Sequence, residues 1–235
     1  MNGLRHGKGT EYYKNGKIKY EGDFAKDKYE GNGKYIWKNG EYYIGKFFNG
    51  LRHGKGIDYY KNDKIKYEGN FIKHKYQGIG KKFYENGEYY IGQFLNGLRN
   101  GIGTEYYLNG TNKYEGYFVK GNYEGNGKYI YKCGNYYIGE WLNGLRHGKG
   151  ILYYKKGSIK YEGDFVKGYY EGNGKYIDEN GNYYIGEYLN GLKHGKEYYI
   201  IKMVLLHMKV ILLKVNMKVM ENIFMKIVII ILVNG

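Results

Sequence analysis

The sequence predicts an all-β protein, an elongated single-layer antiparallel sheet of stacked β-hairpin repeats followed by an apolar tail that does not repeat. Three observations predict this fold class. Short motifs recur every 47 residues, as at Tyr20 and Tyr67; there are 40 glycines and 34 tyrosines but no proline; and no stretch as far as Tyr199 keeps a helical period of apolar residues. Such a repeat is typical of an array in which each unit buries its apolar surface against its neighbours.

The repeat has two similar halves. Lys-Tyr-Glu-Gly begins at Lys19, Lys66, Lys113 and Lys160, and Tyr-Ile-Gly begins at Tyr43, Tyr90, Tyr137 and Tyr184, so that single units alternate between 23 and 24 residues. We predict a repeat array over residues 1–199, with a partial unit at 1–19, seven full units at 20–183 and a partial unit at 184–199. Residues 200–235 form the predicted tail.

Each unit has the composition of a β-hairpin. Between Tyr114 and Tyr131, for example, two runs rich in tyrosine, isoleucine and phenylalanine flank a turn at Lys120-Gly121-Asn122. Glycine permits the positive φ of tight turns, and tyrosine favours strands, where its ring covers the sheet and its hydroxyl meets water. Short strands bounded by such turns at regular spacing predict a meander of hairpins.

One segment carries the signature of a known family. The segment WLNGLRHGKG at Trp141–Gly150, preceded by Tyr137-Ile138-Gly139, resembles the MORN (membrane occupation and recognition nexus) repeat, whose pattern is Tyr-x-Gly-x-Trp, a glycine and His-Gly-x-Gly. The other half, at residues 9–22, is similar to the variant repeat of bacterial antitoxin-like proteins. The aromatic and glycine positions that define the repeat are Tyr43, Gly45, Tyr90, Gly92, Tyr137, Gly139, Trp141, Tyr184 and Gly186. The departures are Phe47, Phe94 and Tyr188 for the tryptophan and Asn100 for a histidine.

The resemblance implies a non-catalytic scaffold or attachment module that mediates protein–protein interaction or self-association. An alternative is peripheral membrane association through anionic phospholipids, and a further one is a truncated, non-functional fragment of a longer repeat protein. We expect a protein partner or a second copy, an acidic phospholipid membrane in the alternative, and no cofactor or small-molecule substrate. We expect a cytoplasmic location, at the inner face of a membrane or on the cytoskeleton in the alternative, because the lone Cys133 fits a reducing compartment and Met1–His6 contains no apolar signal.

All four arginines and one lysine share a single phase of the repeat. This candidate basic ladder is Arg5, Arg52, Arg99, Arg146 and Lys193. One interpretation is a binding surface for lipid headgroups or an acidic partner. The other is structural, with each cation packed on a tyrosine ring or bonded to a turn carbonyl. Ladder members four strands apart lie roughly 19 Å from one another, too far to converge on one small ligand.

The sequence predicts no enzyme and no metal site. Zinc needs three or four ligands within about 2.3 Å, whereas the histidines of successive copies, such as His6 and His53, are as far apart as the ladder cations. No nucleophile elbow, Walker loop or dinucleotide fingerprint occurs. We do not expect nucleic acid as a partner, although lysines interleaved with aromatic rings suit single strands.

The formal net charge of +15 points toward phosphates or an anionic membrane. A compositional explanation competes with this one, because lysine, asparagine, tyrosine and isoleucine share AT-rich codons and only one alanine, Ala25, is present. An AT-rich gene would raise the lysine content without any partner.

Two features of the termini bear on whether the repeat array is complete. The tail is rich in methionine, valine, isoleucine and leucine, and its uncharged runs are far shorter than the ~20 residues of a spanning helix. A shifted reading frame with AT-rich codons restores the repeat there, with a hidden tyrosine at Met208 and another at Ile231, each 47 residues after the preceding copy. We therefore interpret the tail as a frameshifted continuation of the array. Because Met1–His6 matches Phe48–His53, we also expect the chain to be cut from a longer array.

Overall fold

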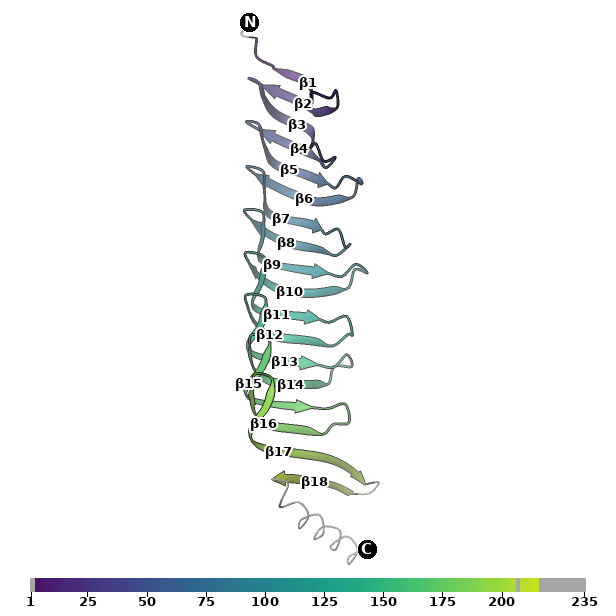
Figure 1. Ribbon diagram of the computed structural model, residues 1–235, viewed down its shortest axis with the longest axis vertical. Coiled ribbons are helices and arrows are strands. Elements are labelled where there is room, and N and C mark those ends of the chain that lie inside the picture. Colours follow the sequence, from purple (N-terminus) through teal and green to yellow (C-terminus); the bar gives the residue numbers. More distant parts are fainter. Residues whose placement is uncertain (1–2, 206–207, 216–235) are drawn as a thin grey trace, which may run out of the picture. The chain divides into compact units, whose positions relative to one another are not determined.

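The computed structural model describes the backbone of residues 3–205 and 208–215 and the side chains of residues 3–195. These residues form strands and no helix (Figure 1). The strands are β1 (Gly7–Tyr12), β2 (Ile18–Ala25), β3 (Lys28–Ile36), β4 (Tyr42–Phe48), β5 (Leu51–Tyr59), β6 (Ile65–Ile72), β7 (Lys75–Phe83), β8 (Tyr89–Leu95), β9 (Leu98–Tyr106), β10 (Asn112–Val119), β11 (Asn122–Ile130), β12 (Tyr136–Leu142), β13 (Leu145–Tyr153), β14 (Ile159–Val166), β15 (Tyr169–Ile177), β16 (Tyr183–Leu189), β17 (Leu192–Leu205) and β18 (Met208–Val215).

The chain divides into two compact units, unit 1 at residues 1–124 and unit 2 at residues 125–235, and the division falls inside β11. In unit 1 every strand from β1 to β10 pairs antiparallel with its neighbour in sequence. Unit 2 does the same from the second part of β11 to β18. Each unit is thus a single antiparallel sheet of hairpins, which confirms the predicted fold class.

Two kinds of connection alternate along the chain. Two-residue turns such as Asn49-Gly50 hold both residues at positive φ, 52° and 83°, as type I′ hairpins require. Longer loops such as Trp37–Glu41 close with backbone hydrogen bonds, among them one from the Trp37 N–H to the Glu41 carbonyl oxygen, 2.8 Å. Because the two kinds alternate, the two-residue turns of each sheet lie along one edge, the turn edge, and the loops along the other, the loop edge (Figure 1).

One face of each sheet, the aromatic face, carries the core. The fully buried Tyr20 ring lies over the cross-strand pair Gly22 and Gly33, and a Cβ added to Gly33 would lie 2.3 Å from the Tyr20 hydroxyl oxygen. The hydroxyl donates to the carbonyl oxygen of Asp23, 2.9 Å away. Eight tyrosines repeat this arrangement: Tyr20, Tyr43, Tyr67, Tyr90, Tyr114, Tyr137, Tyr161 and Tyr184. The Tyr-x-Gly spacing therefore follows from a ring that occupies the space of two missing side chains.

A second set of rings covers these tyrosines. Tyr29 stacks on Tyr20 with centroids 3.9 Å apart, and Phe24 meets the same ring edge-on at 5.1 Å. In unit 2 Trp141 occupies the edge-on position against Tyr137 at 5.3 Å and is 7% exposed. Edge-to-face and stacked pairs are the favoured ring arrangements, so a single-layer sheet obtains a dry core from its own side chains.

The opposite face shows why the full period spans two hairpins. At the centre of each strand, charged cross-strand pairs such as Glu68–Lys81 alternate with apolar pairs such as Ile44–Ile57. Further copies are Glu21–Lys34, Ile138–Ile151 and Glu162–Lys175. Opposed charges and opposed apolar side chains both stabilise antiparallel pairs. Four strands complete the cycle, which corresponds to the 47-residue period.

The predicted boundary at residue 199 lies inside a strand, because β17 runs on to Leu205 and pairs with β18. The rest of the predicted tail, residues 216–235, lies outside the described residues, and its interpretation as a frameshifted continuation stays a prediction.

Candidate interaction surfaces

The predicted basic ladder lies on the aromatic face near the turn edge, where its side chains make contacts within the sheet. Arg52 forms an ion pair with Asp58 through Nη1 and donates from Nη2 to the carbonyl oxygen of His74, 2.9 Å away. Its guanidinium carbon lies 5.0 Å from the centre of the Phe71 ring. The side chain is 16% exposed. Arg52 thus fastens the next two-residue turn to its own strand.

The other members of the ladder also lie over aromatic rings of the sheet. Arg99 pairs with Glu105 at 3.1 Å and donates to the carbonyl oxygen of Gly121. Arg5, Arg146 and Lys193 lie over Phe24, Phe165 and Tyr184 at 4.7, 4.9 and 4.6 Å. This is the geometry that the structural interpretation expects, while the ladder as a binding surface stays a prediction.

Sequence reasoning missed the carboxylates that face this ladder. Glu11 accepts from Arg5 at 2.7 Å, from Lys19 at 2.7 Å and from the Tyr29 hydroxyl at 3.1 Å. Asp58 and Glu105 hold the same position and are 5% and 6% exposed. The signal was present, because an acid follows each of Arg5, Arg52 and Arg99 by six residues.

Burial and ion pairing act in opposite directions on these acids. Burial raises the pKa of Asp58 above its ordinary value, although the Arg52 charge opposes the shift. Burial also acts to raise the pKa of Glu11, but the hydrogen bonds from Lys19 and Arg5 outweigh it and hold that pKa below its ordinary value. The ion pairs and hydrogen bonds of these clusters hold adjacent hairpins together.

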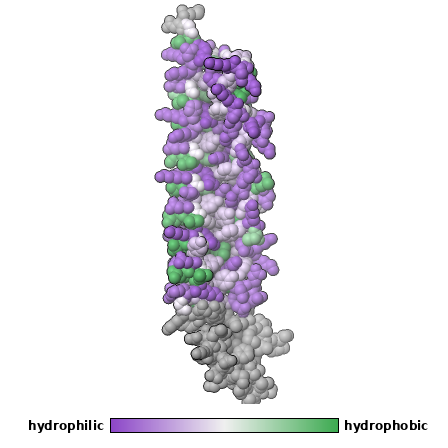
Figure 2. All heavy atoms as spheres, in the orientation of Figure 1, coloured by the Kyte–Doolittle hydropathy of each residue, from purple (hydrophilic) through white to green (hydrophobic). Residues whose placement is uncertain are grey.

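An exposed apolar row follows the turn edge on the opposite face of each sheet. We call it the turn-edge row. In unit 1 it consists of Phe48, Ile72, Leu95, Leu98 and Val119, and in unit 2 of Leu142, Leu145, Val166, Tyr169, Leu189 and Leu192. Phe48 is 60% exposed and Leu192 74%. Figure 2 shows hydrophobic side chains in green alternating with hydrophilic ones in purple along the edge where Figure 1 draws the two-residue turns.

Lysines accompany this row. Lys26, Lys73 and Lys120 take the first position of every second two-residue turn in unit 1, at φ between 46° and 48°, and are exposed. Lys75 faces Ile72 across its hairpin. Successive hairpins are about 10 Å apart because two strands separate them. The turn edge therefore presents apolar side chains at regular intervals in a cationic surrounding.

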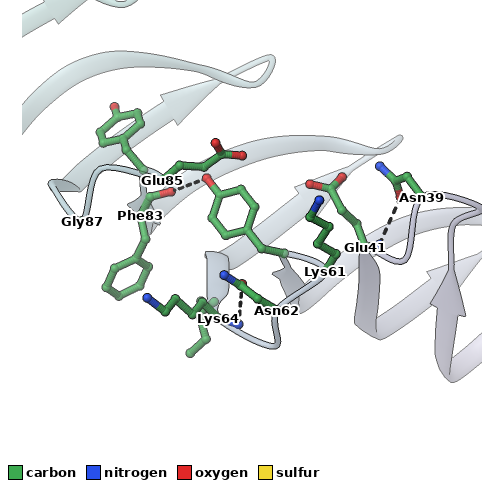
Figure 3. A pocket seen from close by; sticks show the side chains of 11 residues that line it. Asn39, Glu41, Lys61, Asn62, Lys64, Phe83, Glu85 and Gly87 are labelled. Carbon is green, nitrogen blue, oxygen red and sulfur yellow. Dashed lines mark hydrogen bonds between the residues drawn. The ribbon is translucent and has the colours of Figure 1, made fainter.

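The loop edge of unit 1 holds a pocket of about 830 Å³ between three loops (Figure 3). The Tyr60 side chain crosses it and donates to the carbonyl oxygen of Phe83, 2.9 Å away. Charges of both signs line the pocket, including Glu41, Glu85 and Lys64. Glu41 is bound by Lys66 at 2.8 Å, so the lining is largely taken up by contacts of the repeat itself.

Among the residues with described side chains, no group of three or more histidine, cysteine, aspartate or glutamate residues is placed to hold a metal ion. Within the same part of the chain no helix is long and apolar enough to cross a membrane.

The chain matches one family model repeatedly. The MORN repeat model matches nine consecutive segments, residues 1–18, 20–42, 43–63, 67–89, 90–112, 114–136, 137–159, 161–183 and 184–196. The segments begin close to the buried tyrosines, so the match and the structure divide the chain in the same phase. A comparison with curated proteins finds no match.

Proposed function

Because the chain belongs to the MORN repeat family, a non-enzymatic repeat family, we propose that it is a non-catalytic interaction module that docks a partner protein on the turn-edge row. The observation that carries this proposal is the row itself. Isolated exposed apolar residues are ordinary on protein surfaces, whereas exposed apolar residues aligned along one edge, hairpin after hairpin, mark an interaction site. In unit 1 the row includes both residues of the Leu95–Leu98 cross-strand pair.

The charge distribution indicates the chemistry of the partner. The lysines of the turns surround the row, and the chain carries a formal charge of +15. Two copies that met at their rows would bring like charges together, which opposes association. A partner with apolar anchors flanked by carboxylates fits better than a second copy.

Membrane attachment is the second candidate, and the same lysines favour it. Apolar side chains inserted at the headgroup level together with lysines facing anionic lipid are the usual means of peripheral attachment. The row favours a protein, because in unit 1 the exposed lysines Lys28 and Lys75, two hairpins apart, stand at row positions. Discrete apolar anchors suit a shaped partner surface better than continuous hydrocarbon.

The test compares three forms of the chain in quantitative affinity purification from its native cells. These are the wild type, a double variant Phe48→Ser with Leu95→Ser, and the control Leu108→Ser. The control removes a leucine from the loop edge that is even more exposed, 72% against 60% for Phe48 and 46% for Leu95. A specific partner is expected to bind the wild type and Leu108→Ser, and the amount recovered with the double variant is expected to be at least tenfold lower. Equal recovery with all three forms would refute the proposal.

Two measurements on the purified chain separate the alternatives. Co-sedimentation with vesicles of acidic or neutral phospholipid at low and high salt tests the membrane. Binding to acidic vesicles that both serine substitutions abolish would assign the row to lipid instead of protein. Sedimentation velocity over a range of concentrations tests self-association, which the like charges around the row oppose.

A further inference from the structure

The fourth copy of the ion-pair cluster lacks its carboxylate. In the first three copies an acid lies six residues after the ladder arginine, as Glu11, Asp58 and Glu105. In the fourth copy the same position is Leu152, which is 7% exposed. The second acid of the middle clusters, Glu41 and Glu88, is also replaced, by Asn135.

The donors of the cluster are all present. Arg146, Lys160 and Tyr170 stand at the positions that Arg5, Lys19 and Tyr29 occupy around Glu11, each 141 residues further along the chain. Three full periods therefore separate the two sets of donors.

The geometry of these donors is unchanged by the loss of the acid. The guanidinium of Arg146 lies 4.9 Å from the Phe165 ring, against 4.8 Å for its counterpart Arg99 over Phe118. Lys160 Nζ lies 5.3 Å from the Tyr154 ring, as Lys66 lies 5.2 Å from Tyr60. Tyr170 stacks on Tyr161 at 3.8 Å, as Tyr76 stacks on Tyr67 at 3.7 Å.

Leu152 also keeps the register of the acid that it replaces. It pairs with Tyr161 as Asp58 pairs with Tyr67. The leucine therefore occupies the place of the acid, and Arg146, Lys160 and Tyr170 keep the ring contacts of their counterparts.

The positive charge of this copy is not compensated within the described side chains. Among the described side chains no ion pair joins a carboxylate to Arg146 or Lys160, and the polar groups beside Arg146 are neutral. Its Nη2 donates to the Gly168 carbonyl oxygen, 2.6 Å away, and the Tyr131 hydroxyl lies beside its guanidinium. Arg146, Lys160 and Tyr170 are all half-buried. Burying the charges of Arg146 and Lys160 without a counter-charge costs free energy, so binding of an external anion beside them is favourable.

From these observations we propose that Arg146, Lys160 and Tyr170 form a binding site for a carboxylate that an acidic peptide segment of another protein supplies. The same three donors hold a carboxylate in the copy around Glu11, so their spacing suits this group. The buried Leu152 blocks an internal acid, and the ligand enters from the solvent side above an apolar floor. Arg146 contributes the Nη1 donor, the atom that holds the acid in the other copies, because its Nη2 is bound to the Gly168 carbonyl oxygen.

The site is separate from the turn-edge row. It lies on the aromatic face of unit 2, whereas the row lies on the opposite face of each sheet. Serine substitutions at Phe48 and Leu95 are therefore expected to leave it unchanged, so that failure of the proposed function and failure of this site are distinguishable.

The experiment titrates the full chain with a blocked glutamate-rich peptide and, in parallel, with its glutamine counterpart and with inorganic phosphate at matched ionic strength. Calorimetry gives the affinity, and the Nε–Hε signal of Arg146 in NMR spectra locates the site. The glutamate peptide is expected to bind and to shift this signal, and the glutamine peptide is not. Phosphate binding that equals or exceeds peptide binding would overturn the assignment to a carboxylate.

Four variants test the residues. Leu152→Glu supplies the internal carboxylate of the other copies and is expected to weaken peptide binding at least tenfold, whereas the uncharged Leu152→Gln keeps binding. Lys160→Gln, which removes only one charge, is expected to cost about tenfold. The double variant Asp58→Leu with Glu41→Asn removes both acids of a middle cluster, as in the fourth copy, and is expected to create a second, weaker site in unit 1. Unchanged binding in both Leu152→Glu and Lys160→Gln would overturn the proposal.

Discussion

Alanine in place of Gly80 tests the reason for the glycines in the middle of the strands. Gly80 lies beneath Tyr67, whose ring is fully buried. A Cβ at this position would lie 2.4 Å from the hydroxyl oxygen and 2.7 Å from two ring carbons of Tyr67. Ordinary contacts between carbon atoms are 3.5–4.0 Å. The ring must therefore move by about 1 Å, and Tyr76, stacked at 3.7 Å, and Phe94, edge-on at 5.2 Å, resist that movement.

The cost follows from three contributions. Forcing an extra methyl group into a packed core costs about 1–3 kcal/mol. Loss of the hydrogen bond from the Tyr67 hydroxyl to the Asn70 carbonyl oxygen, 3.2 Å, adds about 1 kcal/mol. Removing the backbone freedom of a strand glycine returns about 0.5–1 kcal/mol. The net expectation is a loss of about 1–3.5 kcal/mol.

Native-state hydrogen exchange of the amides in β6 and β7 is the suitable assay, because arrays open locally and need not unfold in two states. The matched control is Gly9→Ala, where the nearest atom to the added Cβ is a Phe24 ring carbon at 3.2 Å and no tyrosine covers the glycine. The control is expected to change stability by less than 1 kcal/mol. Equal effects at the two positions would refute the explanation of the Tyr-x-Gly spacing.

Three further outcomes are expected. Glu41→Asn lowers stability by about 0.5 kcal/mol at neutral pH, because the hydrogen bond from Lys66 holds the pKa of Glu41 below its ordinary value of 4.5. This contribution is lost as the pH falls through the lowered pKa. The melting temperatures of variant and wild type are therefore expected to converge in acid. Lys73→Asn raises stability by about 0.5–1 kcal/mol in urea titrations, because asparagine tolerates the φ of 47° better than lysine. Arg99→Lys costs about 1–3 kcal/mol in the same titrations, because one ammonium cannot replace the fork that joins Glu105 to the Gly121 carbonyl oxygen.

The hairpins could be predicted from sequence because their determinants are local. Gly50 follows Asn49 at a type I′ turn, and Tyr43 covers the glycine two residues later, so that each feature recurs at constant phase. The repeat itself acts as an alignment of the chain with its own copies. It identified the strands, the turns and the ladder without any knowledge of the packing.

The contacts between elements could not be predicted in the same way. The partner of Arg52 is an acid on the same strand together with a carbonyl oxygen of the next turn, and only the register shows that these groups converge. Likewise Leu152 is an ordinary apolar residue in the sequence, and it becomes informative once the other copies are known to hold a carboxylate there. The face on which Leu95 and Leu98 lie follows from strand alternation, but their exposure depends on the absence of a second layer.

Site-specific photo-crosslinking in native cells tests the central claim most directly. A photoreactive amino acid replaces Leu95 in the turn-edge row and, as the control, Leu108 at the loop edge. The account predicts a discrete protein adduct from position 95 that is absent from position 108 and is lost when Phe48→Ser is added. Lipid adducts alone from position 95, or the same protein adducts from both positions, would contradict it.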